Sequence, residues 1–223
     1  MGVRHSRNLS NTAAAALIVV VMPRTASAQP PQQPVVRGDV SATVGWLGVE
    51  TSFGPDSHDR WSGSRYGALG AGWHWTDHLK TEVDFAASGR DRVHRSVPMP
   101  DAGFPRPVET TISRRSLGVS QQYQFFRNTF FHPHVAAGVH TTWETREDLF
   151  QPFFRFDPVT RTPRLVEDTR RDPPRTEVIV RPFVAAGFKA YVTPRAFFRS
   201  DVRVGIRRGL DEAILRLGFG FDF

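Results

Sequence analysis

The last eleven residues of the chain decide its fold: Ala213-Ile214-Leu215-Arg216-Leu217-Gly218-Phe219-Gly220-Phe221-Asp222-Phe223. Every odd-numbered residue here is apolar, and the even-numbered residues from Arg216 onward are small or charged. Successive side chains of a β-strand point to opposite faces, so the alternation predicts a strand between an apolar and a polar medium. Its apolar face carries Leu215, Leu217, Phe219, Phe221 and Phe223.

The same alternation recurs upstream and predicts seven further strands. We place the eight strands at about 39–50, 64–75, 79–90, 116–125, 130–145, 177–190, 198–207 and 213–223. The second of these is rich in glycine, which suits a tightly curved wall where backbones approach each other. Pro133 fits the start of its strand, whereas Pro182 requires either a bulge or a later strand start, because proline donates no ladder hydrogen bond.

The connections between these strands alternate in length until the last one. Long loops are predicted at 51–63, 91–110 and 146–175, and the longest of them, with five prolines, is expected to be mobile. Such alternation puts turns on one rim of a barrel and variable loops on the other. We therefore predict an all-β fold, an eight-stranded antiparallel up-and-down transmembrane β-barrel over residues 37–223.

The composition is compatible with a barrel and excludes other classes. The 223 residues include no cysteine, so neither a disulfide framework nor a thiolate metal site is possible. The hydrophobic share of 39% lies below the roughly 45–50% of soluble domains and excludes a helical membrane protein. A barrel tolerates this share because only alternate residues of each strand meet lipid.

The N-terminal segment has the features of a secretory signal peptide. A basic start with Arg4 and Arg7 precedes an apolar run at 13–22, and Ala26-Ser27-Ala28 follows. This run is too short to cross a bilayer as a helix, which takes about 20 residues. We predict a signal peptide at 1–28 and export of the remaining chain.

Cleavage is predicted between Ala28 and Gln29, and the Gln/Pro-rich segment 29–36 is expected to be a flexible tether. Removing the three arginines of the signal from 29 basic residues leaves 26 against 22 acidic ones, a net charge of +4. The basic residues are spread over strands and loops. No nucleic-acid partner is therefore expected, because such binding needs basic residues gathered on one face.

The signal peptide, the eight strands and the terminal Phe223 together resemble the small bacterial outer-membrane β-barrels: the OmpA transmembrane domain, OmpX and the outer membrane protein β-barrel domain family. The resemblance implies that the apolar face ending in Phe223 is the assembly signal read by the barrel assembly machinery. It also implies a monomeric barrel in the bacterial outer membrane, in contact with lipid and lipopolysaccharide.

Many charged residues have the parity of the barrel interior. They are Lys80, Glu82, Asp84, Arg181, Lys189, Arg199, Asp201, Arg203, Arg207, Glu212, Arg216 and Asp222. A pore lining and a packed ion-pair network both fit this pattern. We favour the network, formed by all of them except Arg207, Glu212 and Asp222, because eight strands leave room only for side chains and unpaired buried charges are costly.

Within that network, Glu82 and Asp84 are expected to meet Arg199 and Arg203 across the barrel, or other basic residues between them. Such contacts would make the interior a plug rather than a conduit.

The sequence predicts no catalytic, cofactor-binding or metal-ligating residue. His132 and His134 are about 6–7 Å apart by strand rise, but a third ligand is not evident and His140 lies about 20 Å further along. A Ser-His-acid arrangement needs a nucleophile within reach of an oriented base, and no such set is recognisable.

The predicted function is a structural or surface-interaction barrel with charged extracellular loops. The alternatives are a small-solute channel, a lipid A-modifying enzyme and a soluble lipocalin-like barrel with an apolar interior. Aromatic residues at the strand ends form two predicted girdles, which favour a membrane barrel over a soluble one. These residues are Trp46, Trp73, Trp75, Tyr123, Phe125, Trp143, Phe198, Phe221 and Phe223.

Overall fold

The computed structural model describes residues 37–50, 61–98, 105–126, 130–157, 162–207 and 209–223, and these form twelve β-strands. The strands are β1 (Gly38–Glu50), β2 (Trp61–His74), β3 (Leu79–Ser88), β4 (Asp91–Val97), β5 (Arg106–Gln124), β6 (Phe131–Phe150), β7 (Phe153–Asp157), β8 (Thr162–Glu167), β9 (Arg170–Arg171), β10 (Arg175–Tyr191), β11 (Ala196–Ile206) and β12 (Leu210–Asp222). Within the described ranges, no helix is long and apolar enough to cross a membrane.

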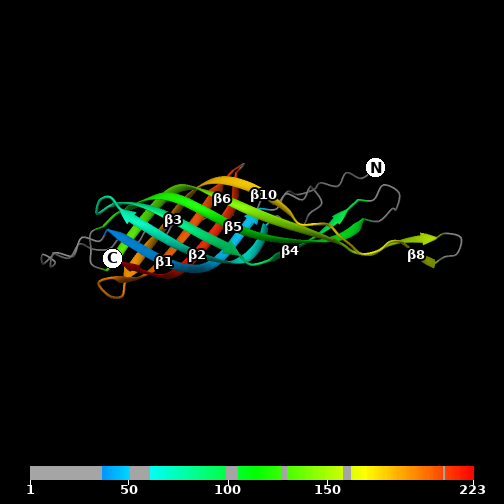
Figure 1. Cartoon of the computed structure of the whole chain (residues 1–223), viewed down its shortest axis with the longest axis horizontal. Helices are drawn as coiled ribbons and strands as arrows, with labels where there is room; N and C mark the ends of the chain where they lie inside the picture. The colour runs from blue at the N-terminus through cyan, green and yellow to red at the C-terminus, as the bar shows by residue number, and fades with distance from the viewer. Residues whose placement is uncertain (1–36, 51–60, 99–104, 127–129, 158–161, 208) are drawn as a thin grey trace, which may run out of the picture. The chain divides into compact units, whose positions relative to one another are not determined.

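Eight of these strands close into one antiparallel barrel, in the order β1-β2-β3-β5-β6-β10-β11-β12 (Figure 1). The first and last strands complete the circle, because β1 pairs with β12 from Asp39↔Asp222 to Val49↔Glu212. The predicted eight-stranded antiparallel barrel is confirmed.

The two ends of the barrel differ in their connections. At one end, here called the short-turn end, lie the β2–β3, β5–β6 and β10–β11 turns together with Gly38 and Phe223. The Gly38 amide donates to the Phe223 carbonyl at 3.0 Å, and the Phe223 amide donates to the Gly38 carbonyl at 2.9 Å. The opposite end, the long-loop end, carries the connections β1–β2, β3–β5, β6–β10 and β11–β12.

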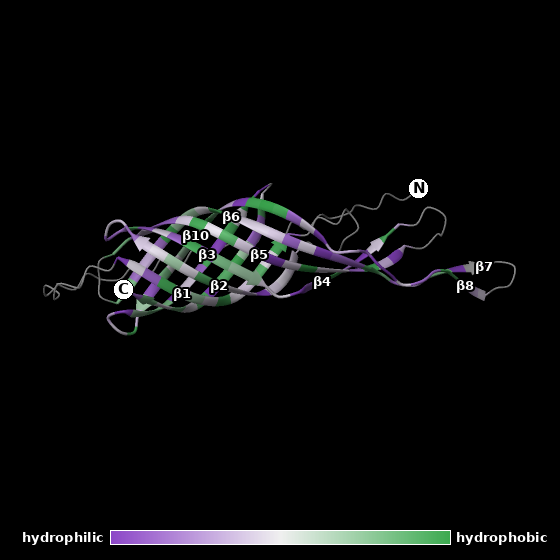
Figure 2. Cartoon of the chain, in the orientation of Figure 1, coloured by the Kyte–Doolittle hydropathy of each residue, from purple (hydrophilic) through white to green (hydrophobic). Residues whose placement is uncertain are grey.

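Side chains alternate between the interior and the outer face of the wall, as Figure 2 shows along the barrel strands. On β11, Arg199, Asp201 and Arg203 are buried inside, while Val202 is exposed outside. This parity is the reverse of a lipocalin-like barrel with an apolar interior. Exposed aromatic residues occur toward both ends, with Trp73, Trp75, Tyr123, Phe125, Phe221 and Phe223 at the short-turn end and Trp46, Trp61 and Trp143 toward the long-loop end.

The prediction of a loop at 91–110 is wrong for most of that range. β4 occupies 91–97 and β5 begins at Arg106, and the two strands pair from Asp91↔Ile112 to Val97↔Arg106. Pro98 and Pro105 lie just outside these strands, so the proline content indicated a loop that is in fact much shorter. The connection between β3 and β4 contains one extra residue, as the pairs Ala87↔Arg115 and Asp91↔Ile112 show. As a result, even-numbered side chains point inward on β3, whereas odd-numbered side chains point inward on β4.

The loop predicted at 146–175 also contains regular structure. β6 continues to Phe150, β7 and β8 form a hairpin, and β9 pairs with the end of β6. β4, the first half of β5, the end of β6 and the short strands β7, β8 and β9 thus form an extension beyond the long-loop end (Figure 1). Arg95 donates to Asp148 at 2.8 Å and Thr110 donates to the same carboxylate at 2.6 Å, which ties the sheet of the extension together.

Both prolines inside predicted strands lie where a pairing ends. Pro133 precedes His134, the first β6 residue in the β5–β6 ladder. Pro182 precedes Phe183, where pairing of β10 with β11 begins, and β10 pairs with β6 through Pro182 without a register shift. Pro182 therefore requires neither a bulge nor a later strand start.

Candidate functional site

Charged side chains fill the barrel interior because strand parity directs them inward from several strands. Lys80, Glu82 and Asp84 follow one another at every second position of β3, and each is at most 2% exposed. β11 contributes Arg199, Asp201 and Arg203, and β12 contributes Arg216 and Asp222, all buried.

Glycines on the inner wall make room for these side chains. Gly118 is the register partner of Asp84, and a Cβ added there would lie 2.7 Å from Asp84 Oδ2. A Cβ added at Gly72 would lie 2.5 Å from Asp39 Oδ1 and 2.7 Å from Lys80 Cδ. A side chain at either position would therefore displace a member of the charged cluster.

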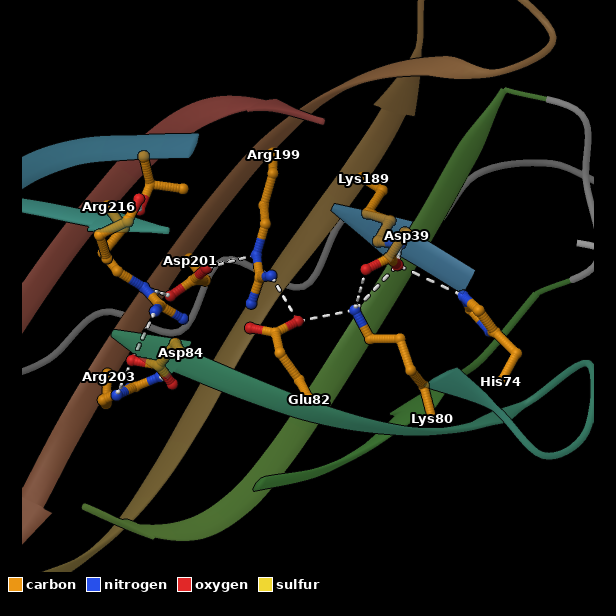
Figure 3. A network of polar contacts seen from close by, with 12 residues as sticks. Asp39, His74, Lys80, Glu82, Asp84, Lys189, Arg199, Asp201, Arg203 and Arg216 are labelled. Atoms are coloured by element: carbon orange, nitrogen blue, oxygen red, sulfur yellow. Dashed lines mark hydrogen bonds and ion pairs between the residues drawn. The ribbon is translucent and has the colours of Figure 1, made fainter. Parts of the chain in front are cut away.

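Arg199 lies at the centre of the cluster (Figure 3). Its Nη1 donates to Glu82 Oε2 at 2.6 Å, and its Nε donates to Asp201 Oδ2 at 2.8 Å. Glu82 Oε2 also accepts from Lys80 Nζ at 2.6 Å. One arginine of β11 thus links carboxylates of β3 and β11 across the interior.

Toward the long-loop end, the cluster continues through two more arginines (Figure 3). Arg216 Nε donates to Asp201 Oδ1 at 2.6 Å, and its Nη1 lies 3.8 Å from Asp84 Oδ1. Arg203 binds both oxygens of Asp84, at 3.2 and 2.8 Å. The Phe183 ring stacks on its guanidinium, with 3.9 Å between Cζ and the ring centroid.

Toward the short-turn end, Asp39 is the hub of the cluster. It accepts from Lys80 at 3.0 Å and from Lys189, and its Oδ2 lies 3.3 Å from His74 Nε2. Lys189 Nζ also lies 3.9 Å from Asp222 Oδ1. Tyr191 donates its hydroxyl to the other oxygen of Asp222.

These contacts form one continuous chain, here called the lumen network. Its charges balance, with five carboxylates and five cations: Asp39, Glu82, Asp84, Asp201, Asp222, Lys80, Lys189, Arg199, Arg203 and Arg216. Eight of the nine residues that the sequence analysis assigned to a network lie in it. The ninth, Arg181, lies apart and pairs with Asp211 at 3.0 Å and with Glu212 at 3.8 Å.

Several participants of the network were not predicted, and one residue was predicted on the wrong side of the wall. Asp222 was assigned to the interior but not to the network, and Asp39, His74 and Tyr191 were not singled out at all. Asp39 could have been found, because its number has the parity of Ser41 and Thr43 on β1. Arg207, predicted to face the lumen, follows the last residue of β11 and is exposed.

The interior is not polar throughout. At its long-loop end it holds an apolar cluster, made of Leu47, Val49, Tyr66, Ala68, Ala86 and Ile214. Beside it, Glu144 accepts from Arg114 at 2.6 Å and from Arg146 at 2.6 Å. Apolar packing and a further ion-pair group therefore lie beyond the lumen network.

Among the described residues, His132, His134 and His140 belong to no group of three possible metal ligands. His134 is 2% exposed, next to Gln122 and Gln124 of β5 on the interior face. Among the described residues, one set could bring three ligand atoms within 4.8 Å of one another, namely Asp39, His74 and Asp222. Lys80 and Lys189 already lie against Asp39, so the protein itself supplies the positive charge at this position.

In the extension, Arg106 ties β8 to β5. Its Nη1 lies 2.6 Å from Glu167 Oε2, and its Nε donates to the Gln151 carbonyl at 2.9 Å. The hydrogen bond and the charge of Arg106 hold the pKa of Glu167 below its ordinary value. The longest connection is therefore held to the barrel strands by a charged contact.

The five residues of the presumed assembly signal all face outward. Leu215, Leu217, Phe219, Phe221 and Phe223 are between 43% and 66% exposed. Phe223 covers Gly38, where an added Cβ would lie 2.8 Å from the Phe223 ring. The predicted cleavage site at Ala28 and Gln29 lies outside the described residues.

Comparison with known proteins supports the architecture through structure alone. No protein-family model matches the chain, and no curated protein is similar to it in sequence. The crystal structure of the outer membrane protein OprG from Pseudomonas aeruginosa is 15% identical, with a TM-score of 0.54 over 84% of this chain and 97% of that one. Neisserial surface protein A (NspA) is 14% identical, with a TM-score of 0.51 over 83% of this chain and 97% of that one.

At these identities the likeness shows the fold, and the geometry agrees with it. Eight antiparallel strands close on themselves, charged side chains point inward and apolar ones outward. The chain has the fold of the small eight-stranded outer-membrane β-barrels.

Proposed function

We propose that the chain is an integral outer-membrane barrel with a closed lumen and a structural or surface-interaction role. The fold and its exposed apolar outer wall support a membrane location, because soluble proteins rarely leave such a surface in water. The solved structures with this fold described above are bacterial surface or outer-membrane proteins, which supports the outer membrane as that location.

The lumen network is the observation that carries the closed lumen. Its five carboxylates and five cations neutralise one another across β1, β3, β10, β11 and β12, so few charges are left for a passing ion. Breaking a buried pair to admit solute would be costly. Beyond the network, the apolar cluster adjoins a cavity of about 10 Å³, which is room for about one water molecule.

The extension at the long-loop end is the part suited to surface interaction. It presents exposed charged side chains, including Arg92, Arg164 and Arg170, and the exposed apolar residues Leu165 and Val166 of β8. We assign it contacts with lipopolysaccharide or with another surface. Assembly would use the barrel assembly machinery through the outward face that ends at Phe223, and the protein would act as a monomer without enzymatic activity.

Planar-bilayer recordings test the closed lumen. Purified barrel, shown to be folded by its heat-modifiable migration in gels, should give no sustained conductance. A variant with Arg199→Ala and Arg216→Ala removes two bridging side chains and, if it folds, should show brief openings that the wild type lacks. Sustained ion-conducting channels from the folded wild type would refute the closed lumen and favour the small-solute channel.

Labelling of single cysteines tests the orientation, since the chain has none of its own. Ser96 on β4 and Arg195 in the β10–β11 turn are both exposed, at opposite ends of the barrel. In intact cells, a membrane-impermeant maleimide should label the Ser96→Cys variant and not the Arg195→Cys variant. Labelling of Arg195→Cys alone would reverse the orientation.

A further inference from the structure

A groove runs along the outer wall of the barrel, over β12, β1, β2 and β3. Its volume is about 600 Å³, and apart from backbone and Thr43 it is lined by apolar residues. Small residues form its floor, namely Ala42, Gly67 and Ala87, and larger ones form its sides, namely Leu69, Phe85 and Phe219. The Phe198 and Phe219 rings lie edge to face there, 5.6 Å apart.

Two arginines stand where the groove approaches the long-loop end. Arg65 precedes Gly67 by two residues on the outer face of β2, and Arg115 is the register partner of Ala87 across β3 and β5. Both are exposed. Neither side chain forms an ion pair or a hydrogen bond with the described residues, whereas Arg92, also exposed, lies 3.5 Å from Glu109.

The wall between these two arginines carries no large side chain. β2 and β5 flank β3, and Arg65 and Arg115 lie two residues apart in register along it, so their backbones stand roughly 12 Å apart at the usual strand spacing and rise. Between them lie Ala87, on the outer face of β3, and Gly89, which follows the end of β3. A recess between two unpaired guanidinium groups fits a phosphate-bearing headgroup, because arginine binds phosphate oxygens in a bidentate manner.

Trp46 marks the depth of this recess relative to the membrane. It is the register partner of Arg65 and covers Gly48, where an added Cβ would lie 2.8 Å from its ring. Tryptophan is enriched at the level of lipid headgroups. The arginines therefore stand at headgroup level, and the apolar groove lies at the level of the acyl chains.

We propose that the groove and the two arginines bind one molecule of lipid A, the phosphorylated and multiply acylated glycolipid of the outer leaflet. Arg65 and Arg115 hold its phosphate, and one acyl chain lies in the groove. The choice of lipid A rests on the proposed function, which directs the long-loop end outward. The occupant is argued from charge complementarity, because two unpaired cations adjoin an apolar groove of about 600 Å³.

Native mass spectrometry of the purified barrel tests the site. The lipids are diphosphorylated lipid A, the same lipid without phosphates, and phosphatidylglycerol. We expect one molecule of diphosphorylated lipid A to be retained, and the Arg65→Gln, Arg115→Gln double variant to bind it roughly tenfold more weakly or worse. Arg195→Gln, an exposed arginine in the β10–β11 turn at the short-turn end, is the control and should bind as the wild type does.

A second variant tests the groove without changing charge. A Cβ at Gly67 would meet only the Thr43 carbonyl, at 3.9 Å, so Gly67→Leu fills the groove without disturbing the wall. This variant should fold normally and lose lipid A to a similar extent. Heat-modifiable migration verifies the fold of every variant.

Several outcomes would overturn the site. Equal retention of lipid A by the double variant and by the wild type would show that the two arginines do not bind the lipid. Equal or tighter binding of phosphatidylglycerol, or of lipid A without phosphates, would show that the occupant is wrong. A closed lumen in bilayer recordings together with any of these results would leave the proposed function intact and reject the lipid site alone.

Discussion

Neutralising Asp84 should destabilise the barrel more than removing any surface charge. Arg203 donates two hydrogen bonds to Asp84 and has no other acidic partner among the described residues, whereas Arg216 keeps Asp201 when Asp84 is changed. Arg203 and Asp84 are each about 1% exposed. Asp84→Asn therefore leaves a buried guanidinium that retains an amide oxygen and the Phe183 ring, but no negative charge.

The expected loss follows from the cost of an uncompensated buried charge. Breaking a buried pair by removing one partner costs roughly 3–5 kcal/mol. Asparagine keeps an amide oxygen that accepts from Arg203, which favours the lower end of this range. We expect Asp84→Asn to lower the free energy of unfolding by about 3 kcal/mol, and adding Arg203→Met to restore a large part of it, because neutral buried pairs are tolerated.

Denaturant unfolding of the refolded barrel in lipid vesicles, followed by tryptophan fluorescence, measures these differences. Arg92→Gln is the control, since its exposed pair with Glu109 is worth less than about 1 kcal/mol. An Asp84→Asn loss no greater than that of the control would refute the reasoning. So would a double variant whose losses are simply additive, because the two groups would then be independent.

Three other predictions follow from single contacts. Gly72→Ala should lower the free energy of unfolding by roughly 1–3 kcal/mol, because the added Cβ would meet Asp39. Gly67→Ala should leave the free energy of unfolding nearly unchanged, and equal denaturation midpoints for the two variants would contradict this. Deleting Phe223 removes the backbone hydrogen bonds between Phe223 and Gly38. The deletion should reduce the amount of folded barrel in the outer membrane without affecting export, and an unchanged amount would contradict this prediction. The pKa of Glu167 is lowered from its ordinary value of 4.5 by its contact with Arg106. The contact therefore stabilises β8 fully above pH 4.5, and this stabilisation is lost as the pH falls through the lowered pKa. The protection of the β8 amides, measured relative to their intrinsic exchange rates at each pH, should fall at acid pH, and an Arg106→Gln variant that shows the same fall would exclude this pair as the cause.

The barrel itself could be predicted from sequence because its wall separates two media. Each membrane-facing strand must alternate strictly, and the predicted β12 face therefore lies outside, with Leu217 beside Val44 and Phe219 beside Ala42. A one-residue register slip would turn every side chain to the wrong face, so the pattern is strongly specified. The same rule placed nine of the ten residues of the lumen network inside.

The extension and the hub of the network could not be predicted in the same way. Beyond the barrel no apolar medium imposes alternation, and the extra residue between β3 and β4 reverses the parity there. Strand parity gives the face of a side chain but not its partner across the lumen. Asp39 meets Lys189, 150 residues away in the chain, and nothing in the residues around Asp39 indicates that contact.

The glycines of β2 show why a closed interior and an outer groove can share one strand. Gly72 faces inward, where Asp39 and Lys80 occupy the space that its missing side chain leaves. Gly67 faces outward, where only one backbone oxygen approaches within 4 Å. Odd-numbered and even-numbered residues of β2 face opposite sides of the wall. The glycines of one strand can therefore make room for charged side chains on the inner face and leave an apolar groove on the outer face. Substitutions at Gly72 should therefore alter barrel stability, and substitutions at Gly67 should alter what the wall binds.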